Sequence, residues 1–171
     1  MVYWNRDDGG NIDLSRLGEE PFRRTFEALG YAWQPVPPEK QAMIQGIKES
    51  LAQGRPAIAF NIIGPPEAGL VAGYAEDGEV LYGWSYFQPW PEHPQPPSAY
   101  YEARDWCEPM DKEITKGLIL VGDKLPSRPA AREVFATSLA WALDLERTAH
   151  RPNLPDHVAG LAAYDAWADA L

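Results

Sequence analysis

Residues 54–87 read GRPAIAFNIIGPPEAGLVAGYAEDGEVLYGWSYF and hold most of the continuous apolar sequence of this chain. Within them, residues 57–63 form a nearly unbroken apolar run that is short and bounded by proline and glycine, which predicts a buried strand. A second strand is predicted over 69–74 and a third over 79–86. The Asp-Gly pair at 77–78 is typical of a tight hairpin turn that needs positive φ. The three runs therefore predict neighbouring strands of one sheet.

Segments with helical periodicity flank these strands. We expect a short helix from about residue 19 that Gly30 ends, and a second from about residue 39 that Gly54 ends. The longest helix is expected from residue 130 to about 148. A last helix is expected over 156–171, and we expect one of its stripes to pack on the body of the protein. That stripe consists of Leu161, Tyr164, Ala168 and Leu171.

Shorter extended segments complete the expected sheet. Residues 31–36 are predicted to be an edge strand, because Pro35 cannot donate a hydrogen bond to a neighbouring strand. Residues 100–106 and 117–122 are further predicted strands. The order of the segments predicts an α+β fold with a largely antiparallel central sheet and flanking helices. The length of 171 residues predicts a single domain over residues 1–171.

Charge and cysteine content limit the classes of partner. The formal net charge of −10 opposes binding to nucleic acid and to anionic membranes, so we expect neither as a partner. Cys107 is the only cysteine, which excludes an intrachain disulfide and favours a reducing compartment. The first residues lack a basic start followed by an apolar core, and no apolar run is long enough to span a bilayer. We therefore expect a cytoplasmic protein.

The order of motifs over about residues 39–86 resembles a known family. A helix ends in Gly-Arg-Pro at 54–56 and an apolar strand follows it, and the next strand ends in Ala-Gly-Tyr at 72–74, before the turn at 77–78. This succession resembles papain-like cysteine peptidases of the bacteriocin-processing kind and the N-terminal domain of the butirosin-biosynthesis acyltransferase. The resemblance implies a papain-like (cysteine proteinase) fold. It also implies a thiol nucleophile on an N-terminal helix, a histidine before the Gly-Tyr strand, and an Asp or Asn after the next strand.

This chain differs from the family at all three catalytic positions. The histidine position falls at or next to Glu67, and the third position falls near Trp84 or Ser85. No cysteine precedes Cys107. The resemblance therefore implies a papain-like domain that lacks the catalytic triad.

The remaining nucleophile and metal candidates are few. Cys107 has three acidic neighbours in sequence, which favour the thiol over the reactive thiolate; these are Asp105, Glu108 and Asp111. The histidines show no metal-ligand spacing, so we expect no metal and no cofactor; they are His93, His150 and His157. A hydrolase or acyltransferase that uses Cys107 stays open as an alternative and requires a histidine that is distant in sequence to meet it.

An aromatic set at the end of the third predicted strand can either fill the core or line a ligand site, and the adjoining proline-rich loop favours the ligand site. Tyr82, Trp84 and Tyr86 share one face of that strand, and Trp90 follows in the proline-rich loop 88–98. Antiparallel pairing of the second and third strands through the turn at 77–78 places Glu67, before the second strand, beside the end of the third strand where these rings lie. Rings supply stacking and a carboxylate supplies an acceptor, so the set suits a cationic or hydroxyl-bearing small molecule.

Three functions are compatible with these patterns. The first is a non-catalytic papain-like domain that binds a small molecule or a peptide through Glu67, Tyr82, Trp84, Tyr86 and Trp90. The second is the Cys107-dependent enzyme. The third is an interaction module that forms a homodimer through its aromatic loop or its C-terminal helices.

Overall fold

The computed structural model describes residues 3–4, 19–60, 62, 68–86, 99–104, 106, 117–150 and 158–171. The chain divides into two compact units, which we describe separately. The sheet unit is Tyr31–Lys124, and the helical unit combines Met1–Gly30 with Leu125–Leu171. The single domain expected from the length stays a prediction.

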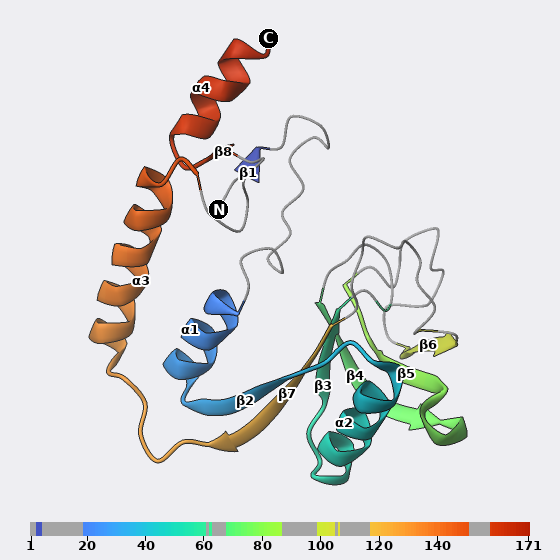
Figure 1. The fold of residues 1–171 in the computed structure, drawn as a ribbon. Coiled ribbons are helices and arrows are strands. Elements are labelled where there is room, and N and C mark those ends of the chain that lie inside the picture. Colours follow the sequence, from blue (N-terminus) through green and yellow to red (C-terminus); the bar gives the residue numbers. More distant parts are fainter. Residues whose placement is uncertain are drawn as a thin grey trace. The chain divides into compact units, whose positions relative to one another are not determined.

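The sheet unit contains a six-stranded antiparallel sheet in the order β2-β7-β3-β4-β5-β6. Its strands are β2 Tyr31–Val36, β3 Ala57–Phe60, β4 Ala68–Ala75, β5 Val80–Trp84, β6 Tyr101–Arg104 and β7 Gly117–Lys124. Helix α2, Lys40–Ala52, packs on one face of this sheet (Figure 1). The α+β class with an antiparallel sheet is confirmed, as is the edge position of the strand that contains Pro35.

The three strands predicted from residues 54–87 are neighbours, as expected. The turn between β4 and β5 is longer than a two-residue hairpin, because a short 3₁₀ helix, η2 Glu76–Gly78, fills it. The predicted positive φ at the Asp-Gly pair is confirmed, with 60° at Asp77 and 105° at Gly78. Two ion pairs connect the turn to α2, Lys40 with Glu79 and Lys48 with Asp77.

The core of the sheet unit lies between α2 and the sheet. Met43 and Ile47 of α2 are almost fully buried. The opposing strands present small residues where the helix approaches, including Ala57 and Ala59 of β3. Gly46 lies in the same contact, since a Cβ there would sit 3.3 Å from side-chain atoms of β7. Small residues on both sides therefore allow the helix to approach the sheet closely.

The helical unit consists of three helices and a two-stranded antiparallel pairing. The helices are α1 Glu20–Leu29, α3 Ala131–Arg147 and α4 Ala162–Asp169, and the strands are β1 Tyr3–Trp4 and β8 Val158–Ala159. Gly30 ends α1 in the left-handed conformation, as predicted. None of the helices in the described ranges is long and apolar enough to cross a membrane.

The prediction for residues 156–171 is wrong in two respects. Val158–Ala159 form β8, and Gly160, with φ of 63°, separates this strand from α4. Within the helical unit the predicted stripe is not buried, because Leu161, Tyr164, Ala168 and Leu171 are all exposed. The buried residues of this region are the small ones, Ala159 and Ala163.

A tyrosine that crosses a glycine connects β4, β5 and β6. The ring of Tyr101 on β6 is 1% exposed, and its hydroxyl donates a hydrogen bond of 3.0 Å to the carbonyl of Leu70 on β4. The ring reaches β4 by passing over Gly83 of β5. Burial raises the pKa of the Tyr101 hydroxyl, so the group stays a neutral donor.

Replacing Gly83 with alanine should destabilise the protein. The added Cβ would lie 1.8 Å from the Leu70 carbonyl oxygen and 2.5 Å from the Tyr101 hydroxyl oxygen, so the ring or the strands must move. We expect a loss on the order of 1–3 kcal/mol in the free energy of unfolding, measured by urea denaturation. Gly73→Ala in the adjacent strand is the control, since its Cβ would meet no atom closer than 3.6 Å. Equal stability of both variants would contradict the packing described.

Candidate ligand-binding site

Strand β5 directs its predicted ligand-binding aromatics away from the core. Side chains alternate between the two faces of a strand: Leu81, Gly83 and Ser85 are buried on the α2 face, and on the other face Val80, at the start of the strand, is buried as well. Trp84 is 46% exposed, and Tyr86, two residues later, is 79% exposed. Tyr82 is partly buried. Tyr82 and Trp84 share one face as expected, whereas Tyr86 lies beyond the end of β5, and Trp84 does not belong to the core.

Strand pairing extends this face across the sheet. Ile119 on β7 pairs with Ile58 on β3, and Ile58 pairs with Leu70 on β4. Leu70 in turn pairs with Trp84. Paired residues share a face, so the four side chains form an apolar row on the face opposite α2. Exposure rises along the row from 4% at Ile119 to 43% at Leu70, so the row is open to solvent toward β4 and β5.

Two aromatic rings meet at the open end of the row. The ring centroids of Trp84 and Tyr100 are 6.5 Å apart, and the ring planes are nearly perpendicular at 85°. Tyr100 immediately precedes β6 and is 61% exposed. A perpendicular pair presents one ring face and one ring edge to the same volume of solvent. Such a corner can contact a flat or cationic group on two sides.

A carboxylate lies on the same face. Glu102 on β6 pairs with Tyr82 on β5, so both project on the side of Trp84. Arg104 donates a hydrogen bond of 2.9 Å to Glu102 and another of 2.9 Å to Glu76. These three charged side chains are exposed, and one guanidinium shared by two carboxylates leaves the group with a net charge of −1 (two carboxylates against one guanidinium). We call the set Leu70, Tyr82, Trp84, Tyr100 and Glu102 the Trp84 site.

The sequence located only part of this arrangement. Tyr82, Trp84 and Tyr86 lie at or next to the end of β5 as expected, whereas Glu67 and Trp90 lie outside the described residues. Sequence reasoning missed Tyr100 and Glu102. Their position follows from the pairing of β5 with β6, and the long proline-rich segment between the strands carries no signal for that register.

The described residues contain no metal-binding cluster. They include no cysteine, and Cys107, His93 and His157 lie outside them. His150, the described histidine, is exposed and belongs to the helical unit. No three His, Cys, Asp or Glu side chains in the described ranges are placed to hold a metal ion. The Trp84 site therefore offers stacking, an apolar surface and a charge.

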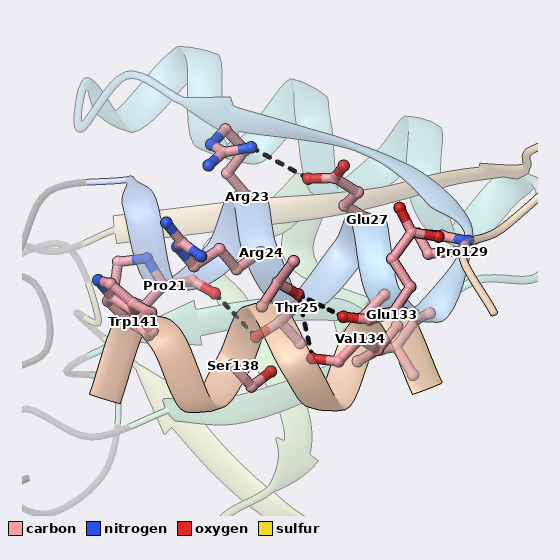
Figure 2. Close-up of a pocket in the computed structure, with 13 residues that line it drawn as sticks. Pro21, Arg23, Arg24, Thr25, Glu27, Pro129, Glu133, Val134, Ser138 and Trp141 are labelled. Atoms are coloured by element: carbon pink, nitrogen blue, oxygen red, sulfur yellow. Dashed lines mark hydrogen bonds and ion pairs between the residues drawn. The ribbon is translucent and has the colours of Figure 1, made fainter. Parts of the chain in front are cut away.

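The helical unit has a cavity of about 610 Å³ between α1 and α3 (Figure 2). Leu29, Val134 and Trp141 supply apolar lining, and polar side chains from both helices surround them. The guanidinium carbon of Arg24 lies 4.7 Å from the centre of the Trp141 ring, a cation–π contact between the two helices.

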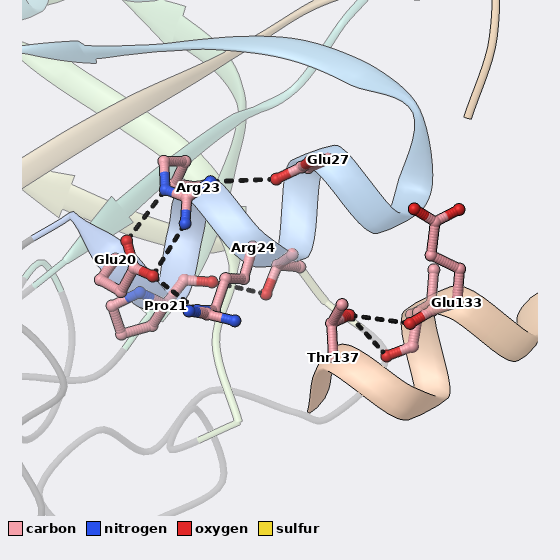
Figure 3. Close-up of polar contacts among 9 residues, drawn as sticks. Glu20, Pro21, Arg23, Arg24, Glu27, Glu133 and Thr137 are labelled. Atoms are coloured by element: carbon pink, nitrogen blue, oxygen red, sulfur yellow. Dashed lines mark hydrogen bonds and ion pairs between the residues drawn. The ribbon is translucent and has the colours of Figure 1, made fainter. Parts of the chain in front are cut away.

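Charges on the α1 side of this cavity are paired with one another (Figure 3). Arg23 donates two hydrogen bonds to Glu20, of 2.8 and 2.9 Å, and one of 3.0 Å to Glu27. Arg24 donates a hydrogen bond of 2.6 Å to Glu20. Thr25 bonds back to a carbonyl of its own helix. The charged and hydroxyl groups of α1 already have hydrogen-bond partners within the helix, so the cavity offers a ligand mainly apolar contact.

Comparisons with known proteins identify no relative. No family model matches the chain, and no curated protein and no solved structure matches it. The resemblance to papain-like peptidases therefore stays a prediction, and functional inference has to come from the geometry of the two units.

The ion pairs of Glu20 predict an acid-sensitive contribution to stability. The hydrogen bond from Arg23 is the main cause that lowers the pKa of Glu20 from 4.5 to about 2. A carboxyl whose pKa is lower in the folded state stabilises that state above its unfolded pKa and loses the effect as it becomes protonated. The contribution should therefore be complete above about pH 4.5 and disappear toward pH 2. It should be small, because the side chain is 38% exposed.

Thermal denaturation of Glu20→Gln between these pH values measures the effect. The variant should lose less stability on acidification than the parent protein. Glu133→Gln on α3 is the matched control, since Glu133 makes no side-chain ion pair among the described residues. Identical pH profiles for Glu20→Gln and the parent would show that these ion pairs do not stabilise the fold.

Proposed function

We propose that this protein is a non-catalytic, papain-like domain that binds a cationic or hydroxyl-bearing small molecule, or a peptide carrying such a group, at the Trp84 site. The observation that carries the proposal is the exposed, perpendicular pair Trp84 and Tyr100 at the open end of an apolar row. In a monomeric protein, large apolar side chains exposed side by side commonly mark a binding surface.

The charge around the rings favours a cation. Glu102 lies on the same face as Trp84, and the whole chain carries a formal net charge of −10. An aromatic ring attracts a cation through its negative face, with about 0.5–1 kcal/mol at an exposed site. A ring and a carboxylate that act together therefore select a positively charged group over a neutral one of the same shape.

The papain-like component of the proposal has a separate basis. A helix, α2, precedes three consecutive antiparallel strands, β3, β4 and β5, in the order that the resemblance implies. The non-catalytic component rests on the sequence, which has no cysteine before Cys107 and has Glu67 at or next to the position of the family's histidine. An enzyme that uses Cys107 is the alternative.

Choline and its neutral carbon isostere, in which a tert-butyl group replaces the trimethylammonium group, provide a direct test. Saturation-transfer NMR should detect choline on the parent protein and detect the isostere more weakly. Trp84→Ala should weaken choline binding about two- to fivefold, which corresponds to about 0.5–1 kcal/mol, and should keep the protein folded because the side chain is half exposed.

Two further variants make this test specific. Glu102→Gln should weaken the binding of choline and leave the isostere unchanged. Tyr164→Ala on α4 removes a tyrosine that is about as exposed as Tyr100 and lies far from β5 in sequence. This control should change the binding of neither choline nor the isostere. The proposal fails if Trp84→Ala binds choline as well as the parent does, or if Trp84→Ala unfolds the protein.

A further inference from the structure

Helix α3 carries an exposed apolar stripe. Phe135, Leu139 and Leu143 are 70%, 51% and 39% exposed. They follow one another at intervals of four residues, so they lie on one side of the helix. Exposed alanines border the stripe at positions 136 and 142. A contiguous apolar surface of this kind on a helix marks an interaction surface.

The stripe is separate from the side of α3 that faces its own unit. Val134, Ser138 and Trp141 line the cavity shared with α1, and Leu145 is buried. At 100° per residue these four positions lie together on the helix, and Phe135, Leu139 and Leu143 lie on a different side. The helix therefore uses one side within its unit, and the described residues of that unit leave the other side exposed.

The stripe is symmetric about Leu139. Phe135 lies four residues before Leu139 and Leu143 four residues after it, and Ala136 and Ala142 lie three residues to either side. Arg132 and Glu146 lie seven residues to either side, near the two ends of the stripe, and both are exposed. Neither forms an ion pair within the part of the chain that the structure describes.

We propose that the partner of this stripe is the same stripe of a second copy of the chain, with the two α3 helices antiparallel and a two-fold axis at Leu139. A two-fold interface requires that each contact occur twice with the roles exchanged. In this arrangement Leu139 meets Leu139, and Phe135 meets Leu143 at two equivalent places. The small side chains at 136 and 142 lie at the same levels on the two borders of the contact and permit close approach.

The charges determine the direction of the pairing. Antiparallel helices place Arg132 of each copy opposite Glu146 of the other, which gives two attractive pairs. Parallel helices would place Arg132 against Arg132 and Glu146 against Glu146, which repel. Antiparallel helices also oppose their dipoles favourably. The formal charge of −10 on each chain resists association, and an interface with two attractive pairs adds no net charge.

The contact is expected to be weak. The helix has 17 residues and is therefore about 26 Å long, so one side of it buries less than the roughly 800 Å² per partner of a standard interface. The association should therefore appear as a monomer–dimer equilibrium at micromolar or higher protein concentration. Sedimentation equilibrium of the full chain over the micromolar to millimolar range measures it.

Leu139→Glu should abolish the dimer, because two like charges would meet at the axis. Its matched control is Ala140→Glu, which adds the same charge one residue along the same helix and outside the stripe. This control should dimerise like the parent. A parent that stays monomeric at all concentrations overturns the proposal. If, in addition, Leu139→Glu is less thermally stable than the parent, the stripe is covered within one chain.

A charge exchange distinguishes the proposed pairing from unspecific apolar association. Arg132→Glu and Glu146→Arg should each weaken the dimer at least tenfold, because each variant replaces both attractive pairs with repulsive ones. The double variant should restore the dimer. If each single variant dimerises as the parent does, or if the double variant stays monomeric, the antiparallel arrangement is wrong.

Discussion

The sheet unit depends on the path of the Tyr101 ring across β5. Gly83 provides the only side-chain-free position of β5 under that ring, and the hydroxyl ends at the Leu70 carbonyl of β4. Three strands are thus connected by one buried side chain on the α2 face. Leu70 and Tyr101 also determine where the two exposed rings lie on the opposite face. Leu70 pairs with Trp84, and Tyr101 follows directly after Tyr100. The buried contact of Tyr101 and Leu70 is therefore adjacent to both exposed rings, Trp84 by strand pairing and Tyr100 by sequence.

Much of the fold could be predicted from local sequence signals. The apolar runs identified β3, β4 and β5, Gly30 marked the end of α1, and the Asp-Gly pair marked a turn with positive φ. These signals are local, since each depends on the conformational limits of a few adjacent residues. The membership of the Trp84 site depends instead on pairing between β5 and β6. That register joins residues separated by a long segment, and no local pattern specifies it.

The error at the C-terminus has a different physical origin. Residues 161–171 show helical periodicity, and the periodicity correctly predicts a helix, but it does not say what covers the apolar side. Leu161 and Tyr164 are exposed while Ala159 and Ala163 are buried, so the buried positions of this region hold small side chains. The stripe on α3 is a second case in which helical periodicity identifies an apolar side without showing what covers it. Amphipathicity identifies a face, and its partner can be the same chain or another one.

The register shift in β4 has a consequence for how this strand tolerates change in length. Leu70 pairs with Trp84 on the exposed face, whereas Tyr74, four residues later, pairs with buried Leu81 and carries Lys48 of α2 at 5.8 Å from its ring centre. Regular alternation would put Leu70 and Tyr74 on the same face of β4. The extra residue at the register shift, between Val71 and Gly73, places them on opposite faces. The two halves of β4 thereby direct their large side chains to opposite faces: Leu70 to the exposed face, and Tyr74 to the face on which α2 packs. Loss of that single residue would not merely shorten β4 but would exchange the faces of one half, so homologous chains that keep both surfaces must keep the length of this strand.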